Sequence, residues 1–359
     1  MTYDLIIVGG GITGVSALYH MSQKKGIKTL LLEKNSQLGL GASGTWGFLT
    51  RVFHYRLEVT KLAQQAVDFH YHFKQHFGGD NHYIKTGSLY FLKKNMLDDY
   101  AQHFDFLEKN DVDFQILEAV EGKKRFPNFC WYEDDVVVFE PQGGLTGLGS
   151  SANYLASAAC NNPNCEVRLQ TPVEKLLYND GQIEGVQLAN GEILKSKVVA
   201  LCLGPWGFSF LESIDEPMPF FPRIIQLNKF HRYRQNIKDP FFIDGSSSIF
   251  GHYLPSGSFI GGYLRKQSFR EDVMPGKVSS IEANEAKHEI GKRITWIKNA
   301  ALEGGISAIE SYSPRGYGHV TWSSQIKNLL YTGGFSCTGY LLFPTNGREI
   351  ADKVTKALN

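Results

Sequence analysis

The chain has 359 residues, of which 42% are hydrophobic, and a formal net charge of +1. This length suffices for one large or two closely joined domains with a sizeable core, and the near-neutral charge without a basic stripe argues against a nucleic-acid partner. No apolar run approaches the ~20 residues that cross a bilayer, and the N-terminus lacks a signal-peptide pattern, so we expect a cytoplasmic protein with no membrane partner.

The five cysteines predict reduced thiols and no metal site. They are odd in number, and none of their spacings matches C-x-x-C or a zinc-ligand pattern. Cys160 and Cys165 flank a turn, so a redox pair is the alternative interpretation. Reduced thiols fit the expected cytoplasmic location better.

The N-terminal stretch predicts a strand–helix–strand unit. Residues 5–8 form an apolar run that is typical of a buried parallel strand. Apolar residues then recur at helical spacing from Ile12 to Met21. Residues 29–32 predict a second buried strand, which ends at Glu33.

Three glycines and one acidic residue indicate that this unit binds a dinucleotide. In the G-x-G-x-x-G spacing, Gly9 allows a tight turn, Gly11 lets the backbone approach a pyrophosphate, and Gly14 lets helix and strand pack closely. The helix N-terminus offers N–H groups and a positive dipole end to the phosphates. Glu33 is placed to accept hydrogen bonds from the adenosine ribose. The alternative is a glycine-rich turn in an α/β domain without a ligand.

Further elements follow in chain order. The glycine-rich residues 38–47 can place backbone N–H groups against a phosphate or a flat ring. Helices are predicted at residues 58–77, 96–109, 153–159, 280–302 and 345–358. Strands are predicted at residues 87–92, 136–140, 166–169, 197–203 and 329–334.

Two β-rich segments interrupt this α/β pattern. Residues 185–194 predict a hairpin in which Asn190 and Gly191 supply the positive φ angles of a tight turn. Residues 223–264 carry four β-type runs without a long helix, which predicts an antiparallel sheet.

The order of these elements predicts an α/β fold with two domains. We expect a Rossmann-type cofactor domain, assembled from discontinuous segments, and an α+β substrate domain with a mainly antiparallel sheet. The cofactor domain is expected at residues 1–84, 145–215 and 320–359. The substrate domain is expected at residues 85–144 and 216–319.

Five motifs, spread over nearly the whole chain, carry a family resemblance. They are Val8–Gly14 with Glu33, Gly41–Gly44, Lys85–Leu89, Val199–Trp206 and Gly333–Gly339. Together they resemble the FAD-dependent superfamily of D-amino-acid oxidase, glycine oxidase and monomeric sarcosine oxidase. The run Thr50-Arg51, followed by a helix and Lys-Thr-Gly, is most similar to the monomeric sarcosine oxidase branch.

The resemblance implies FAD as the cofactor of an FAD-binding domain. Arg51 matches a basic residue near the isoalloxazine ring, and the last helix matches one whose positive end stabilises the reduced flavin. Residues 306–312 lack the cysteine that attaches the flavin in some members, so we expect non-covalent FAD. The residues expected at the cofactor are Gly9, Gly11, Ile12, Thr13, Gly14, Glu33, Lys34, Gly41, Ala42, Ser43, Gly44, Trp46, Gly47, Val173, Gly204, Trp206, Gly334, Thr338, Gly339 and Tyr340.

The resemblance also implies an oxidoreductase. The expected reaction oxidises a C–N bond of an amine, an N-methyl amine or an amino acid derivative by hydride transfer to flavin N5. The expected partners are this small-molecule substrate and an electron acceptor, either O2 in an oxidase or another acceptor. Two alternatives stay open: a flavin enzyme that oxidises the C–O bond of a 2-hydroxy acid, and an FAD-binding accessory protein without turnover.

The basic residues that hold a substrate carboxylate in this family are absent from the matching positions. In this chain those positions carry Glu310, His54 and Leu341. The lysine that the family uses for oxygen activation matches a position near Phe259 or Ile260, and neither residue is basic. The loss of such charge-assisted bonds leaves two explanations. In the first explanation another base holds the carboxylate, with Arg223, Arg265 and Arg315 as the candidates.

The second explanation is a substrate without a free carboxylate. Glu310 would then bind a cationic amine, unless it is only a solvated loop carboxylate. His252, Tyr253 and Tyr263 are expected on strands that face the flavin, although buried tyrosine and histidine can also be core residues. The candidate catalytic residues are Arg51, His54, His252, Tyr253, Tyr263 and Glu310.

Overall fold

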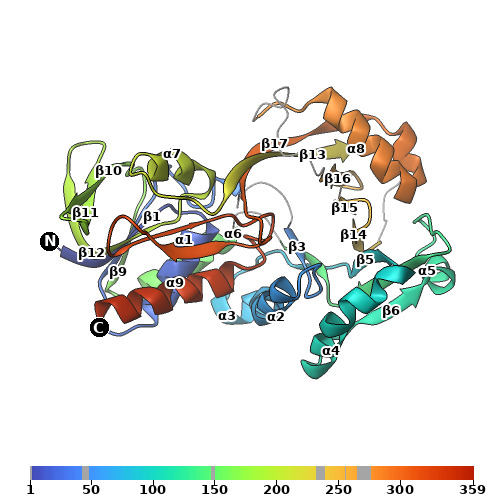
Figure 1. The fold of residues 1–359 in the computed structure, drawn as a ribbon, viewed down its shortest axis with the longest axis horizontal. Helices are drawn as coiled ribbons and strands as arrows, with labels where there is room; N and C mark the ends of the chain where they lie inside the picture. Colours follow the sequence, from blue (N-terminus) through green and yellow to red (C-terminus); the bar gives the residue numbers. More distant parts are fainter. Residues whose placement is uncertain (1, 43–47, 147–149, 232–238, 255, 265–275) are drawn as a thin grey trace.

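The computed structural model describes residues 2–42, 48–146, 150–231, 239–254, 256–264 and 276–359. The chain forms two lobes, and both termini lie in the same one (Figure 1). Two long paired strands, β13 (Phe221–Phe230) and β17 (Leu302–Tyr312), run from one lobe to the other. The elements build two eight-stranded sheets and one three-stranded sheet.

The first sheet contains the predicted dinucleotide-binding unit. Its members are β1 (Thr2–Val8), β2 (Thr29–Leu32), β9 (Cys165–Arg168), β10 (Val173–Asn179), β11 (Gln182–Leu188), β12 (Ile193–Leu201), β18 (His319–Trp322) and β19 (Leu329–Gly333). The strands β9, β2, β1, β12 and β19 lie side by side and run parallel. The strands β10, β11 and β18 extend the sheet in antiparallel fashion. The strands predicted in these regions are confirmed.

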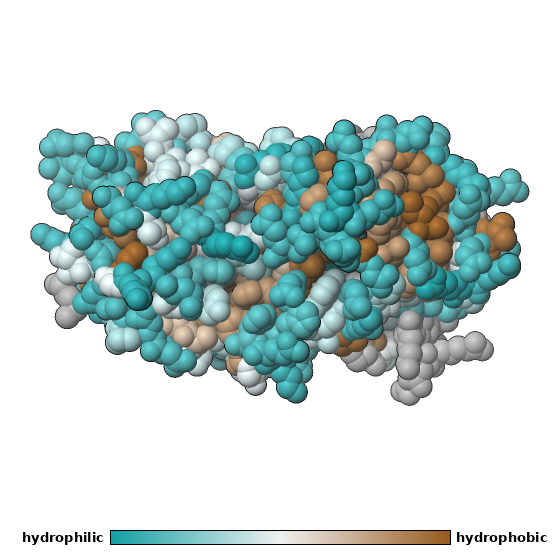
Figure 2. Space-filling view, turned by 90° about the horizontal axis from the view of Figure 1, so that it is seen from below, coloured by the Kyte–Doolittle hydropathy of each residue, from teal (hydrophilic) through white to brown (hydrophobic). Residues whose placement is uncertain are grey.

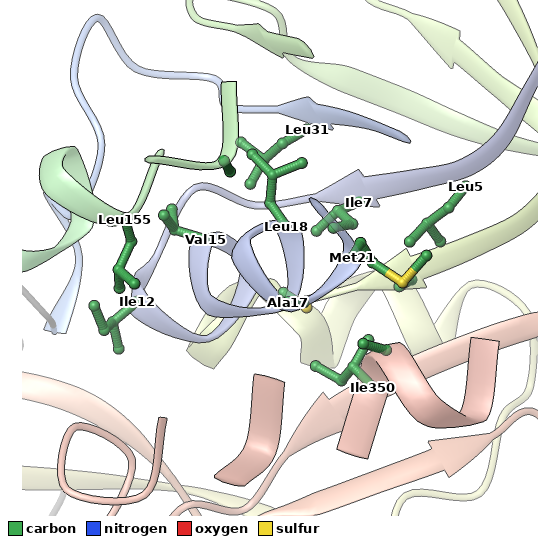
Figure 3. Packing of buried hydrophobic residues seen from close by; sticks show 14 of the residues in the cluster. Leu5, Ile7, Ile12, Val15, Ala17, Leu18, Met21, Leu31, Leu155 and Ile350 are labelled. Atoms are coloured by element: carbon green, nitrogen blue, oxygen red, sulfur yellow. The ribbon is translucent and has the colours of Figure 1, made fainter. Parts of the chain in front are cut away.

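Strand β1 is buried on both faces, which is why its sequence is an uninterrupted apolar run. Leu5 and Ile7 pack into a cluster with the helices on one face (Figure 3). Ile6 and Val8 pack into a second cluster on the other face. The helices of the first cluster are α1 (Ile12–Ser22), α6 (Ser150–Cys160) and α9 (Phe343–Leu358).

The second sheet forms the other lobe and is mainly antiparallel. Its strand order is β17-β13-β16-β15-β14-β5-β7-β6, and only the β14–β5 pair is parallel among the described residues. Its remaining strands are β5 (Ser88–Lys93), β6 (Gln115–Glu118), β7 (Asp135–Glu140), β14 (Phe241–Asp244), β15 (Ile249–Tyr253) and β16 (Phe259–Tyr263). The antiparallel sheet predicted for residues 223–264 is confirmed, and the strands predicted at 87–92 and 136–140 join it.

A small sheet and several helices complete the fold. The small sheet pairs β3 (Phe48–Thr50), β8 (Gly144–Thr146) and β4 (Ile84–Lys85). The remaining helices are α2 (Leu57–Tyr71), α3 (Phe73–Phe77), α4 (Ala101–Lys109), α5 (Ala119–Arg125), α7 (Gly207–Glu212) and α8 (Ser280–Arg293). Short 3₁₀ helices are η2 (Lys94–Tyr100), η3 (Gly204–Trp206) and η4 (Thr295–Asn299).

Several local predictions need correction. The helix predicted at 58–77 is broken at His72, and the one at 280–302 ends at Arg293. The turn of the hairpin at 185–194 uses one positive φ, at Gly191 (87°), and none at Asn190. Asn190 instead uses its side-chain oxygen to accept a hydrogen bond from the Glu192 N–H at 2.9 Å, as asparagine commonly does in turns.

All five cysteines are unpaired thiols in the structure. Each helix in the described ranges is too short or too polar to cross a membrane. The face seen in Figure 2 is mostly hydrophilic, and its hydrophobic residues gather toward the end that carries the second sheet. Ile116 and Val120, from β6 and α5, are among the exposed apolar residues of that lobe.

A buried arginine joins α8 to two strands of the second sheet. The Arg293 Nε donates to Asp244 Oδ2 at 2.7 Å, and its second guanidinium branch donates to Asp135 Oδ1 at 2.9 Å. The guanidinium also lies 4.3 Å from the Phe91 ring centroid. Burial raises the pKa of Asp135, but its hydrogen bonds, that to Arg293 first, bring this pKa below the ordinary value. The three charges therefore form one satisfied buried group.

We expect Arg293→Met to destabilise the fold by about 3–5 kcal/mol, because it leaves the buried Asp244 without its cation and Asp135 with Lys93 alone. Chemical denaturation monitored by tryptophan fluorescence measures this change. The matched control is Lys292→Met: Lys292 is its exposed neighbour and pairs only with Glu289 on the same helix among the described contacts. The control is expected to change the free energy of unfolding by less than about 0.5 kcal/mol. Equal effects of both substitutions would contradict the assignment.

Candidate active site

A cavity of about 1070 Å³ lies where the two lobes meet. It exceeds the roughly 300–1,000 Å³ of pockets for drug-sized ligands, so it has room for a larger ligand. On one side it is lined by Val8, Leu32 and Cys202, at the carboxyl ends of three parallel strands. On the other side it is lined by residues of the long strands β13 and β17. Ligands of parallel α/β sheets bind at such carboxyl ends.

Two glycines allow the close approach of β1, α1 and β12 beside this cavity. Gly9 has a φ of 112°, and a Cβ there would lie 2.4 Å from the Cys202 carbonyl oxygen. A Cβ on Gly14 would lie 2.1 Å from the Gly9 carbonyl oxygen. Any side chain at either position would push the helix away from the strands. Gly9 lines the cavity, whereas Gly14 acts from behind it.

The N-terminus of α1 faces the cavity. Its N-cap is Gly11, which has no side chain to cap the helix, and Gly11, Ile12 and Thr13 all line the cavity. The positive end of the helix dipole therefore points at the ligand space. This is the geometry of an anion site for phosphate groups.

Glu33 lies at the end of β2 and lines the same space. Its Oε2 accepts from the Gly10 N–H at 2.7 Å, and its Oε1 accepts from the Asn35 N–H at 2.8 Å. Oε1 also accepts from Asn35 Nδ2 at 2.6 Å, so Oε2, which accepts one bond, is the oxygen that can still accept a ligand hydroxyl. Glu33 thus holds the glycine turn at Gly10 as well as facing the cavity.

The remaining predicted nucleotide-end residues also meet at the cavity. Lys34 places its ammonium 4.5 Å from the Trp206 ring centroid, and Val173 and Gly204 line the wall beside them. Gly41 and Ala42 line it as well. The predicted residues Ser43, Gly44, Trp46 and Gly47 lie outside the described part of the chain. The sequence prediction missed the lining residues Asn35, Leu40, Thr171 and Pro172, which are close neighbours in sequence of predicted ones.

The loop between β19 and α9 closes the cavity. Ser336 and Cys337 both have left-handed backbones, with φ of 50° and 63°, a conformation that costs energy in non-glycine residues. Strand β17 holds them there: the Ser336 N–H donates to the Ser311 carbonyl oxygen at 3.0 Å, and the Cys337 N–H donates to Glu310 Oε1 at 2.9 Å. The predicted Thr338, Gly339 and Tyr340 line the cavity, and Gly334 does not.

Glu310 is part of a hydrogen-bonded cluster, which corrects the alternative of a solvated loop carboxylate. It lies on β17, lines the cavity, and its Oε2 accepts from the Cys337 thiol at 3.0 Å. Burial raises the pKa of Glu310 more than the bonds from Cys337 and the charge of Arg223 lower it. The Tyr312 hydroxyl lies 2.9 Å from the Cys337 Sγ.

Arg223 lies directly across from Glu310 in the β13–β17 pair. It lines the cavity, and its guanidinium carbon lies 4.8 Å from the Tyr312 ring centroid. Of the three arginines considered from the sequence, Arg265 lies outside the described residues. Arg315 does not line the cavity, and its Nε donates to the Tyr317 carbonyl oxygen at 3.2 Å. Arg223 is therefore the described candidate that reaches the site.

Arg51 and His54 form a buried pair in the cavity wall. One Arg51 guanidinium nitrogen donates to His54 Nδ1 at 3.1 Å, which places the ring proton on Nε2. Burial, and then the Arg51 charge, hold the pKa of His54 well below its ordinary value, so the ring is neutral. Burial lowers the pKa of Arg51 to about 10, which leaves it charged at neutral pH.

Glu140, which the sequence prediction did not assign to the site, positions this pair. Its carboxylate accepts from the N–H groups of Val52 and Phe53, both at 2.8 Å. Burial raises the pKa of Glu140, and these two bonds and the Arg51 charge limit the rise. An acidic residue at the end of the fully buried strand β7 was the available indication of this role.

Three predicted pocket residues lie elsewhere, and this is a correction. Tyr253 packs in the core of the second lobe, where its hydroxyl accepts from Trp296 Nε1 at 3.1 Å. His252 is buried in β15 and Tyr263 packs against the same core, and none of the three lines the cavity. Alternation along β15 places Tyr253 on the face opposite to cavity-lining Phe250, whereas His252 shares the face of Phe250 and lies outside the lining. Aromatic residues that the sequence prediction missed, among them Tyr55, Tyr90 and Tyr100, do line it.

The described residues contain no group of three or more His, Cys, Asp or Glu side chains placed to hold a metal ion. At the family's basic positions, Leu341 lines the cavity as an apolar residue. Phe259 and Ile260 are buried in β16, so neither can replace a lysine. The charged chemistry of the site therefore rests on Lys34, Arg51, Arg223, Glu33 and Glu310.

Known proteins resemble this chain in sequence. The family model "DAO: FAD dependent oxidoreductase" matches residues 4–353. A curated 4-methylaminobutanoate oxidase (formaldehyde-forming) of Paenarthrobacter nicotinovorans is 25% identical over 97% of this chain and 43% of that protein. A monomeric sarcosine oxidase of Arthrobacter sp. (strain TE1826) is 27% identical over 61% of this chain and 56% of that protein. This chain spans about half the length of these two relatives.

Solved structures share the fold. L-proline dehydrogenase from P. horikoshii superposes with a TM-score of 0.85 at 18% identity, covering 99% of this chain and 94% of that one. Glycine oxidase from Bacillus cereus ATCC 14579 gives a TM-score of 0.76 at 19% identity, covering 99% and 95%. At these identities the likeness is one of fold, and the predicted α/β fold class is confirmed.

We expect Glu33→Ala to weaken binding of FAD, the dinucleotide that the family model names, by about 10- to 150-fold. The loss of a hydrogen bond to a charged group, about 1.5–3 kcal/mol, sets this range. Titration of the cofactor-free protein with FAD, followed by flavin fluorescence, measures it. The control is Glu166→Ala on neighbouring β9, whose carboxylate bonds Tyr3 and Arg168 and does not line the cavity. An unchanged affinity for Glu33→Ala would refute this role.

Proposed function

This chain belongs to the DAO family of FAD-dependent oxidoreductases, and we propose that it oxidises a C–N bond of an amino acid derivative or a related amine that carries a carboxylate. The observation that carries the proposal is Arg223, a cavity-lining cation directly across a strand pair from Glu310. One positive and one negative side chain side by side match a substrate that bears both a carboxylate and an amine.

The residues at the cavity fit FAD. Gly9, Gly11 and the N-terminus of α1 would hold the pyrophosphate, because they leave room for it and face it with a positive dipole end. Glu33 would accept from the ribose hydroxyls. FAD, when bound, supplies the acceptor for a hydride. The loop Thr338–Tyr340, just before the N-terminus of α9, would cover the flavin, where a positive dipole end favours negative charge.

The chain's own residues orient the substrate and set its protonation state. Arg223 would bind the carboxylate and so fix the C–H bond next to nitrogen for transfer. The amine must be neutral to release a hydride. The positive charges of Arg51 and Arg223 would lower the pKa of an ammonium group in the cavity and favour the neutral amine, whereas a charged Glu310 beside it would raise that pKa. His54 stays neutral because of its depressed pKa and adds no competing charge.

The carboxylate anchor predicts a selective effect of Arg223→Met. We expect the KM for carboxylate-bearing amines such as N-methylglycine to rise about 10- to 150-fold, the cost of losing a hydrogen bond between charged groups. An amine without a carboxylate, such as N-methylbutylamine, should be unaffected. Anaerobic reduction of the bound flavin measures both. Arg315→Met, which removes a cation outside the cavity lining, is the control.

The same assay separates the alternatives. Reduction of the flavin by 2-hydroxy acids, and by none of the amines, would replace the proposed reaction with oxidation of a C–O bond. A flavin that stays oxidised with every amine, amino acid and hydroxy acid would point to an accessory protein without turnover. Equal losses for both classes of amine in Arg223→Met would remove Arg223 as the carboxylate anchor.

We also propose that the FAD is not covalently attached. The Cys337 thiol donates a hydrogen bond to Glu310 Oε2 at 3.0 Å. Burial first, and then the Glu310 charge, raise the pKa of this thiol well above its ordinary value. A protonated thiol is a poor nucleophile. Acid precipitation of the yellow protein should therefore release all flavin into the supernatant, for the wild type and for Cys337→Ser alike. Flavin retained on the wild-type pellet and released from Cys337→Ser would identify a covalent link through Cys337.

A further inference from the structure

Side chains of β13 and β17 alternate between two different environments. Gln226 of β13 faces α8, because its Nε2 donates to the Ser279 carbonyl oxygen at 2.9 Å and its Oε1 accepts from the Ser279 N–H at 2.7 Å. Ser279 is the N-cap of α8. The alternate residues Ile225 and Leu227 therefore point to the opposite face, and they line the cavity, to which Gln226 also contributes.

The register of β13 and β17 places apolar residues in pairs on this face. Ile225 lies opposite Ala308, and Leu227 lies opposite Ile306. Side chains directly opposite in a strand pair are in contact distance. The cavity lining continues past them with further apolar side chains from β15 and the end of β16. We call this surface the apolar strip, and it consists of Ile225, Leu227, Phe250, Leu264, Ile306 and Ala308.

The strip begins next to the charged pair. Arg223 and Glu310 occupy the next same-face position on the two strands. Four residues of β-strand span about 13 Å, so the strip extends by about this distance from Arg223 to Leu227. All six strip residues are half-buried, although apolar side chains of this size are usually fully buried. The cavity wall thus changes from charged to aliphatic along the β13–β17 strand pair, from Arg223 toward Leu227.

A competing polar group at this wall is already satisfied. Asp244 also lines the cavity, but its Oδ2 accepts from Arg293 at 2.7 Å and its Oδ1 accepts from the Ser246 hydroxyl at 2.6 Å. The aliphatic surface is therefore the part of this wall whose contact with a ligand lowers the free energy of the complex most. Apolar ligand surface that leaves water and packs against it lowers the free energy of the complex.

We propose that the substrate carries an aliphatic group of several carbons, which lies along the apolar strip while its carboxylate lies at Arg223. This inference rests on the proposed function and adds the class of substrate: an aliphatic amino acid or N-alkyl amino acid, in place of the smallest members of the class. A substrate such as glycine would reach Arg223 and leave the strip in contact with water.

A binding experiment tests the strip without turnover. FAD-loaded wild-type protein is titrated with acetate, propanoate, butanoate, pentanoate and hexanoate, and the change in flavin absorbance gives each Kd. We expect the Kd to fall about fourfold per added methylene, the factor that corresponds to roughly 0.8 kcal/mol per buried CH2. Equal Kd values for acetate and hexanoate would overturn the proposal.

Two substitutions locate the effect. Leu227→Ser and Ile306→Ser should each raise the Kd of hexanoate about tenfold and leave that of acetate unchanged, because only the longer chain reaches them. The matched control is Leu302→Ser, a residue of the same strand β17 that is 42% exposed and does not line the cavity. Equal shifts for acetate and hexanoate in both strip variants would overturn the proposal.

Flavin reduction then separates this inference from the proposed function. We expect racemic N-methylleucine to reduce the flavin with a second-order rate constant at least about tenfold higher than that of N-methylglycine. A factor of about ten is the lower bound for the effect of one added methylene in a hydrophobic pocket. If no amine reduces the flavin but the Kd of the acids falls with chain length, the proposed reaction fails and the strip stands. If amines reduce the flavin, but neither the Kd of the acids nor the rate constant of the amines depends on chain length, the role of the apolar strip is rejected and the proposed reaction is kept.

Discussion

The contact between the β1–α1 turn and the end of β12 is the constraint on which the site depends. Gly9 lies against the Cys202 carbonyl and Gly14 lies against Gly9, with no room for a side chain at either. This contact brings the N-terminus of α1 to the carboxyl ends of the parallel strands. A helix held even slightly farther away would no longer present its positive end to the cavity, since dipole effects fall off within the first turn.

The second lobe contributes one continuous wall through the long strands β13 and β17. Their register sets the order of chemistry along that wall: Arg223 with Glu310 first, and then aliphatic pairs. Glu310 also joins this wall to the loop before α9 through its bonds to Cys337. The same strand pair therefore positions the charged part of the site and holds the strained loop that lines the cavity.

Two other buried charged side chains hold neighbouring segments of the fold in place. Glu140 fixes the segment that carries Arg51 and His54 by accepting two backbone N–H bonds. Arg293 neutralises two carboxylates in the core of the second lobe. In both cases the cost of burying charge is offset by complete hydrogen bonding. The cavity walls thus rest on rigid supports, which is what a site that orients a small substrate requires.

The sequence by itself determined the cofactor unit, because its information is local. The apolar run of β1, the spacing of Gly9 to Gly14 and the acidic end of β2 each depend on neighbouring residues, and they predicted a fold that the structure confirms. The tertiary structure alone decided which distant side chains share the cavity. The sequence allowed His252 and Tyr253 to be pocket or core residues. Strand pairing brings Arg223 beside Glu310, and contacts between distant segments bring Glu140 to Val52 and Phe53 and Cys337 to Glu310. A period of two allows either face of a strand to be the inner one, and the pairing register makes that choice.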